Sequence, residues 1–271
     1  MSTIPKTVPP LPRAKTFVRN LDTWAGLDWL SKGWQDLFQA PFSSFYYGLA
    51  LFVISWLVLG AIFALNYDYI LFPALAGFMI IGPLLAIGMY EKSRRLALGE
   101  PVTLASVFFV KPASGGQVLY SGVLLCVLMM LWMRAAVILY GLFYGMQPFS
   151  GIENIHDTLF LTPRGNALLI VGTFVGGLFA AFSFAISVFA VPMLLAERTD
   201  ALTAMGTSMA LVWNNLRTMI VWGVIVFSLF ILGVSSGFVG FILIFPLLGH
   251  ATWHAYLAIR QPENAVRPDK T

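Results

Sequence analysis

Six long apolar runs dominate the chain. They cover roughly residues 44–65, 69–90, 118–145, 166–190, 218–236 and 238–258. Each run has about 19 residues or more, and a helix that rises ~1.5 Å per residue crosses the ~30 Å hydrocarbon core of a bilayer with that length. Backbone polar groups in lipid must be hydrogen-bonded within their own segment, as they are in a helix. The pattern therefore predicts an all-α membrane protein with six transmembrane helices.

Three shorter segments have an amphipathic pattern, at 28–39, 101–110 and 200–213. In the first of them, Leu30, Trp34 and Phe38 share one face of a helix, and polar residues occupy the other face. Helices of this kind lie in the membrane interface. Because each segment precedes a pair of apolar runs, we expect three hairpins, each preceded by a short interfacial helix, as an internal repeat. The alternative is that helices joining membrane spans resemble one another without a repeat.

The two ends of the chain are polar and frame the membrane domain. The first 20 residues contain four prolines and four positive charges, which is typical of a disordered segment. The sequence predicts a disordered basic cytoplasmic tail at 1–27, a six-helix membrane domain at 28–259 and a second cytoplasmic tail at 260–271.

Composition and charge agree with this organisation. Only 10% of the residues are charged and 59% are hydrophobic, whereas a soluble domain has about 25% charged residues. With six spans, all of the 16 Lys and Arg residues except Arg134 and Arg164 lie in the tails or in the loops on the same side as the tails. Basic loops stay inside the cell, so both termini are predicted to be cytoplasmic. The net charge of +4 reports this orientation, and we expect a lipid bilayer as partner and no nucleic acid.

Arg134 is the most unusual residue of the apolar runs. An arginine at the centre of a bilayer costs about 2.5–3.5 kcal/mol on insertion scales. One interpretation is an anchor at the outer interface, because the long side chain can extend to the headgroups. The other is a residue that faces the bundle and pairs with Asp68, Glu153 or Asp157, either as a structural link or as an anion site in a transporter.

His250 and His254 are four residues apart, so they share one face of a helix. Two imidazoles at this spacing could hold a metal or haem, although zinc sites use three or four protein ligands. Aromatic residues that gather at membrane boundaries suggest interfacial anchoring instead. The expected anchors are Trp29, Trp34, Trp253 and Tyr256. We therefore expect no cofactor, with haem or metal at the two histidines as the alternative.

Three motifs resemble those of a bacterial family of predicted integral membrane proteins, the domain of unknown function 2189. They are Trp29-Leu-Ser-Lys-Gly-Trp34-Gln-Asp-Leu, Ala190-Val-Pro192-Met-Leu-Leu-Ala-Glu197-Arg and Pro246-Leu-Leu-Gly-His250-Ala-Thr-Trp253-His254-Ala-Tyr256. The resemblance implies a multi-pass protein of the bacterial inner membrane, and it brings no known activity or catalytic residues. Some relatives carry the label cytochrome c oxidase subunit I, but three histidines and six spans are too few for such a subunit.

Three functions are compatible with these features. The sequence has no phosphate-binding loop, no Gly-x-Ser-x-Gly turn, no His-Glu-x-x-His and no CxxC. We therefore expect a non-enzymatic scaffold or accessory factor that contacts other membrane proteins. The alternatives are a small-solute channel or transporter that uses Arg134, and a haem- or metal-linked respiratory accessory component that uses His250 and His254.

Overall fold

The computed structural model describes residues 17–19, 21–145, 151 and 154–260. It is 82% helical, with no strand in the described residues. Six helical segments in this part of the chain are long and apolar enough to cross a membrane. The predicted class, an all-α membrane protein with six spans, is confirmed.

The six spans follow the apolar runs closely. They are α2 (Pro41–Ala64), α3 with α4 (Leu71–Leu85 and Ile87–Leu98), α6 (Gln117–Tyr144), α8 with α9 (Pro163–Ser187 and Ala190–Ala196), α11 (Leu216–Ser235) and α12 (Phe241–Arg260). The other elements are α1 (Ala25–Phe38), η1 (Asp68–Ile70), α5 (Leu104–Phe108), α7 (Ile155–Phe160) and α10 (Ala201–Asn214). The second span differs most from its predicted end at residue 90. The helical segment does not end at residue 90, because α4 extends to Leu98 and its polar residues 91–93 are buried against the rest of the protein.

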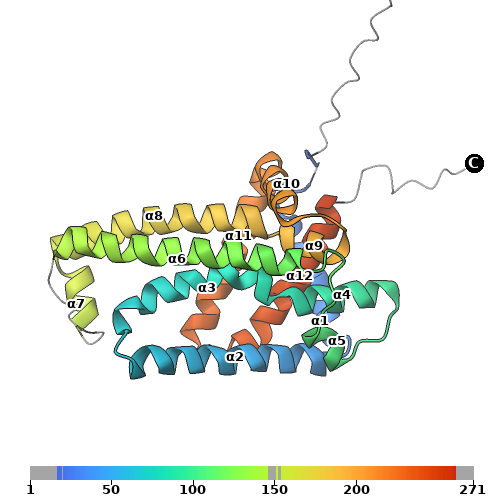
Figure 1. The fold of residues 1–271 in the computed structure, drawn as a ribbon, viewed down its shortest axis with the longest axis horizontal. Coiled ribbons are helices and arrows are strands. Elements are labelled where there is room, and N and C mark those ends of the chain that lie inside the picture. The colour runs from blue at the N-terminus through green and yellow to red at the C-terminus, as the bar shows by residue number, and fades with distance from the viewer. Residues whose placement is uncertain (1–16, 20, 146–150, 152–153, 261–271) are drawn as a thin grey trace, which may run out of the picture.

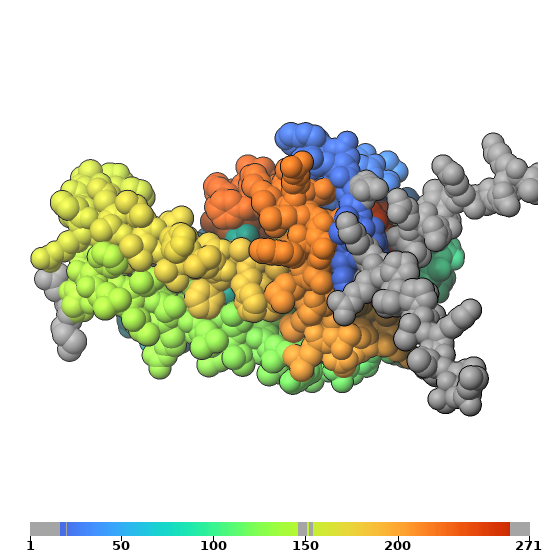
Figure 2. Space-filling model, turned by 90° about the horizontal axis from the view of Figure 1, so that it is seen from above, coloured from blue at the N-terminus to red at the C-terminus, as the bar shows by residue number. Residues whose placement is uncertain are grey.

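The spans form an elongated bundle whose two ends differ (Figure 1). Helices α6 and α8 run side by side along one edge, α2 runs along the opposite edge, and α3 lies between them. Helices α1, α4, α5, α9 and α10 gather at one end, which we call the basal end, and η1 and α7 lie at the other, the distal end. Seen from above, α10 again lies next to the N-terminal segment, and α6 and α8 extend away from them (Figure 2).

Both ends of the described chain lie at the basal end. The Arg19 side chain donates from Nε to the Ile259 carbonyl at 2.8 Å. The Asn215 amide donates to the Phe17 carbonyl, also at 2.8 Å. An even number of spans returns the chain to the side where it began, so this arrangement agrees with six crossings.

The N-terminal segment differs from the predicted tail where the structure describes it. Residues 17–19 are held by these contacts, and α1 begins at Ala25, before the predicted domain start at residue 28. Residues 1–16 and 20 of this tail, and 261–271 of the C-terminal tail, lie outside the described residues.

Helix α12 is the centre of the bundle. In its most apolar stretch 61% of the residues are buried inside the protein, compared with 17% in α2. Helix α2 packs on α12 at Gly48, where an added Cβ would lie 2.1 Å from the Ile242 carbonyl oxygen. Helix α3 packs on α6, where the Trp132 indole donates to the Pro73 carbonyl at 2.9 Å. The apolar side chains of α2, α3 and α6 that face outward therefore meet lipid or another membrane protein.

Candidate functional site

A network of buried polar side chains lies at the basal end, where α1, α2, α4 and α12 meet. We call it the basal polar network. Its members are Asp36, Ser44, Lys92, Ser93, His250 and His254. Only His254 is partly exposed, and the other five side chains are buried. Buried polar groups are costly unless they are hydrogen-bonded, so each member has to be explained by its partners.

Lys92 begins the network on α4 with no exposed surface. Its ammonium donates to the Ser44 hydroxyl at 2.8 Å, to the Ala40 carbonyl at 3.1 Å and to the Leu37 carbonyl at 3.4 Å. These three acceptors match the three donors of a lysine. One of them, the Leu37 carbonyl, is in the last turn of α1, where the helix dipole favours a positive charge. The tight connection from α1 to α2 passes through Ala40 with a positive φ of 52°.

His250 occupies the middle of the network and is completely buried. Its Nε2 lies 2.9 Å from the Ser44 hydroxyl, and its Nδ1 lies 2.8 Å from the Ser93 hydroxyl. Both ring nitrogens are thus engaged with serines of different helices. We expected His250 to lie at the membrane interface. In the structure its ring is instead enclosed by protein.

Asp36 ends the network on α1. Its Oδ2 accepts from the Ser93 hydroxyl at 2.6 Å, and it lies 2.8 Å from Nε2 of His254. His254 is the only member at the surface of the network. The carboxylate therefore joins α1 to both α4 and α12.

The hydrogen positions follow from the acceptors. Ser93 gives its single proton to Asp36, so its oxygen accepts from His250, which carries its proton on Nδ1. Nε2 of His250 then accepts from Ser44, whose oxygen accepts from Lys92. All donors point in one direction, from the ammonium to the carboxylate. A neutral His250 thus bridges the only two formal charges buried in the network.

The pKa of Asp36 is set by two opposing effects. Burial by itself raises the pKa of this carboxyl group. The hydrogen bonds from His254 and Ser93, together with the electrostatic attraction of His254, outweigh burial and bring the pKa below its usual value. The groups that face this carboxylate are His254 and His250 from α12 and Lys92 from α4. The ionised form is therefore the one that the fold stabilises.

Acid is expected to weaken this end of the fold. Because the unfolded chain holds a proton on Asp36 more tightly than the folded chain, the stabilisation is complete above the unfolded pKa of about 4 and is lost as the pH falls below it. Thermal unfolding in detergent between pH 6 and pH 3 should show a steeper loss of Tm for the wild type than for Asp36→Asn. Equal slopes would contradict this role, and the comparison removes the contribution of other acids such as Glu197.

A second cluster ties α9 to α12 beside the network. Arg260 donates to Glu197 from Nε at 2.8 Å and from Nη2 at 2.6 Å, and the Tyr256 hydroxyl donates to the same carboxylate. The hydrogen bonds from Arg260, followed by that from Tyr256, hold the pKa of Glu197 below its usual value against the opposing effect of burial. A bidentate pair of this kind is geometrically specific.

The three motifs of the sequence meet at this end. Asp36 of the first motif bonds His254 of the third, and Glu197 of the second motif bonds Tyr256 of the third. Lys92, Ser93 and Ser44 lie outside the motifs, and the sequence indicates Lys92 only as one of the charges that predict orientation. Their roles were missed because partners in the network are as far as 206 residues apart in the chain, as Ser44 and His250 are.

The structure does not bring the other predicted site residues together. Arg134 is exposed on the outer face of α6, and no ion pair joins it to Asp68 or Asp157 within the described residues. Asp157 is exposed in α7 and contacts the neighbouring His156, while Asp68 lies in η1. Glu153, the third suggested partner, lies outside the described residues.

The expected aromatic anchors have different surroundings. Trp34 is exposed at the basal end. The other three are buried in the protein, with Trp29 packed edge-on against Trp222 at 5.5 Å and Trp253 packed on Tyr256 at 5.4 Å. Tertiary packing therefore uses these rings inside the bundle.

The fold defines a multi-pass integral membrane protein with a charged, hydrogen-bonded base. Residues 71–196 match the family model described as "Predicted integral membrane protein (DUF2189)", which is the family that the motifs resemble. The matched segment includes Lys92 and Ser93, whereas the first and third motifs lie outside it. A search of curated proteins and a search of solved structures found no match.

Proposed function

We propose that the protein is a non-enzymatic scaffold or accessory factor of the bacterial inner membrane. The observation that supports this is the basal polar network, in which each buried polar group already has a partner in the protein. Such a network holds α1, α2, α4 and α12 in one arrangement and leaves the outward apolar faces of α2, α3 and α6 for contacts in the bilayer. A rigid base and wide apolar faces suit a protein that acts by binding other membrane proteins.

The same network argues against a haem or metal at the two histidines. Both nitrogens of His250 bond serines, and Nε2 of His254 bonds Asp36. A metal would have to displace these partners and leave buried hydroxyls unsatisfied, at a cost of about 1–3 kcal/mol each. Among the described residues, no three His, Cys, Asp or Glu side chains are placed to share a metal ion. We therefore propose that the protein has no cofactor at this position.

We also propose the orientation and the repeat that the sequence predicts. In this proposal the basal end, with both termini, is cytoplasmic. Helices α1, α5 and α10 are the interfacial helices of three repeated units, each followed by two spans. Exposed Trp34 on α1, Phe108 on α5 and Trp213 on α10 support this placement, since aromatic rings favour the interface.

The proposed function is tested by crosslinking in native membranes. Cys126 is the only cysteine and is exposed on α6, so a photoreactive maleimide can be attached there without mutation. Single cysteines at Val53 on α2 and Phe174 on α8, both exposed, extend the test on a Cys126→Ser background. We expect discrete protein adducts from at least one helix face, with Cys126→Ser as the unlabelled control. Lipid adducts alone from all three positions would contradict the proposal.

The competing functions have their own readouts. An absorbance spectrum and a metal analysis of the purified protein are expected to show no haem and no stoichiometric metal. A Soret band or a metal that disappears in His250→Ala/His254→Ala would instead establish the respiratory alternative. Solute efflux from proteoliposomes that is lost in Arg134→Leu would establish the transporter.

A further inference from the structure

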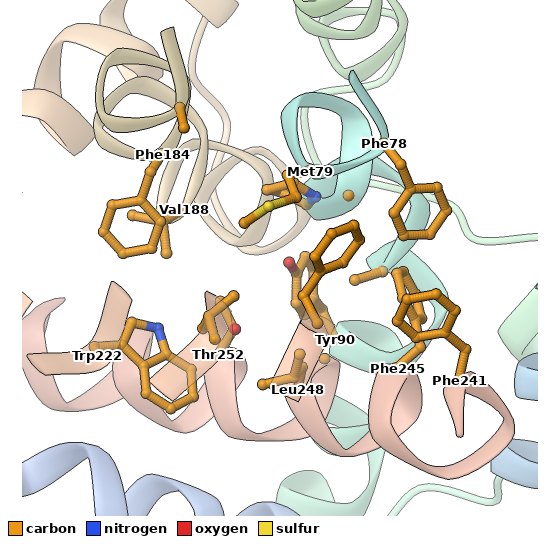
Figure 3. A pocket seen from close by; sticks show the side chains of 17 residues that line it. Phe78, Met79, Tyr90, Phe184, Val188, Trp222, Phe241, Phe245, Leu248 and Thr252 are labelled. Carbon is orange, nitrogen blue, oxygen red and sulfur yellow. The ribbon is translucent and has the colours of Figure 1, made fainter. Parts of the chain in front are cut away.

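An apolar cavity of about 110 Å³ lies in the membrane region between α3, α8, α11 and α12. Aromatic rings from all four helices form much of its wall, among them Phe78, Phe184 and Phe241 (Figure 3). Phe184 on α8 lies across the cavity from Trp222 on α11 (Figure 3). Phe184 and Met79 are only half-buried, so the wall reaches the lipid-facing surface.

Small residues explain why the space is not filled. Gly82 lines the cavity from α3, and a Cβ added there would meet nothing within 4 Å. Ala86 and Ala180 line other parts of the wall. Larger side chains at these positions would occupy the cavity, so its size is set by residue choice.

Three polar groups interrupt this apolar wall. The Trp222 side chain is completely buried, and its indole nitrogen has no hydrogen-bond partner in the described part of the chain. The hydroxyls of Tyr90 and Thr252, both buried, also line the cavity, and neither bonds another described residue. In Figure 3 the Trp222 nitrogen is on the edge of the ring nearest Thr252. A buried donor without an acceptor costs about 1–3 kcal/mol, and an indole can only donate.

We propose that this cavity binds the ring of a neutral, lipid-soluble quinone, whose carbonyl oxygen accepts from Trp222, Tyr90 or Thr252. The lining contains no charged side chain, so a neutral ligand fits best. A carbonyl oxygen would give a buried donor such as the Trp222 indole the acceptor that it lacks, and the quinone ring would fill the empty space of the cavity. This inference goes beyond the scaffold function and does not depend on it.

The shape of the wall favours a flat ring over an acyl chain. Phe78 stacks on Phe230 at 6.0 Å and on Phe241 at 5.6 Å, both with ring planes inclined by 25°. Aromatic walls pack a further ring in offset or edge-on geometry. The cavity here, at about 110 Å³, is smaller than the apolar cavity of ~150 Å³ that takes up benzene in another protein, so a single six-membered ring is the largest group we expect it to take. A prenyl tail would leave toward the lipid past the half-buried wall.

Binding is tested with a 1,4-benzoquinone that carries one isoprenyl unit, titrated into the full chain in lipid nanodiscs. Quenching of tryptophan fluorescence gives the Kd, and the rise of Tm with quinone concentration confirms that the folded protein binds it. We expect saturable binding by the wild type. The quinone without protein, in empty nanodiscs, corrects for partition into the bilayer.

A matched pair of variants locates the site. Gly82→Leu fills the cavity without a backbone clash, because its Cβ position is open, and should weaken binding at least about tenfold. Gly60→Leu, exposed on α2 with nothing within 4 Å of its Cβ position, should leave the Kd unchanged. Tyr90→Phe and Thr252→Val each remove one hydroxyl, and at least one of them should weaken binding about threefold to tenfold.

Several outcomes would overturn the proposal. No saturable quenching up to the solubility limit would exclude quinone binding, and an equal Kd for Gly82→Leu would place the quinone elsewhere. Native mass spectrometry that finds an acyl lipid lost in Gly82→Leu, with no quinone competition, would assign the cavity to lipid instead. The crosslinking result for the scaffold is independent of all three, so failure of one proposal does not imply failure of the other.

Discussion

Lys92→Met is expected to lower the free energy of unfolding in detergent by about 3–5 kcal/mol, the usual cost of removing one partner from a buried charged network. Methionine keeps most of the side-chain volume and removes the ammonium. The carbonyls of Leu37 and Ala40 and the Ser44 hydroxyl would then lose their donor. Asp36 would remain as a buried charge with no opposite lysine in the network.

A second lysine provides the control. Lys32 also forms an ion pair, with Asp28 at 2.7 Å, but half of its side chain is exposed. Surface pairs contribute about 0–1 kcal/mol, so Lys32→Met should change stability by less than 1 kcal/mol. Unfolding by SDS titration or by heat measures both variants. Similar losses for Lys92→Met and Lys32→Met would show that the network does not stabilise the base.

Asp36→Asn tests whether the two charges act together. The amide keeps the size of the carboxyl group and removes its charge. In a double-mutant cycle, the loss for Lys92→Met with Asp36→Asn should be smaller than the sum of the single losses, since each single variant leaves one charge uncompensated. Additive losses would mean that the two ends of the network are energetically independent.

Gly48→Ala is expected to destabilise the protein by about 1–3 kcal/mol or more, the range for overpacking in a tight interface. The added methyl would lie 2.1 Å from the Ile242 carbonyl oxygen and 2.7 Å from its carbon, both backbone atoms of α12. Neither atom can move without shifting the helix. Since α12 carries His250 and His254, separation of α2 from α12 would also stretch the contact from Ser44 to His250.

Gly60→Ala on the same helix is the matched control. A Cβ at Gly60 meets nothing within 4 Å. In a helix interior, alanine is favoured over glycine by about 1 kcal/mol, so this variant should be neutral or slightly more stable. Thermal unfolding of the pair separates close helix approach from helix propensity. Equal changes at both positions would contradict a tight α2–α12 contact.

The membrane class of this protein could be predicted from local sequence. A run of apolar residues long enough to cross a bilayer becomes a helix wherever it lies in the chain, because the backbone must satisfy its own hydrogen bonds in lipid. The six predicted runs therefore correspond to the six spans. The end of the second run was predicted too early, since residues 91–93 look like a polar boundary and are buried by the packing of other helices, among them α1 and α12.

The candidate site could be predicted only in part. The spacing of His250 and His254 marks one face of α12, and the motif at 29–37 contains Asp36. The partners of these residues depend on how distant helices pack. Arg134 shows the same limit. Its position in an apolar run indicates that placing it in the bilayer costs free energy, but the direction in which its side chain faces depends on the neighbours of α6.

The sequence by itself determined the all-helical membrane class, the positions of the spans and the resemblance to a family, since each is written in local composition or in short motifs. Only the tertiary structure decided that Lys92, Ser44, His250, Ser93, Asp36 and His254 form one network and that three donors line one cavity. The physical reason is that hydrogen bonds and cavities arise between helices far apart in the chain. Apolar periodicity specifies which faces are buried, but not which helix covers each face.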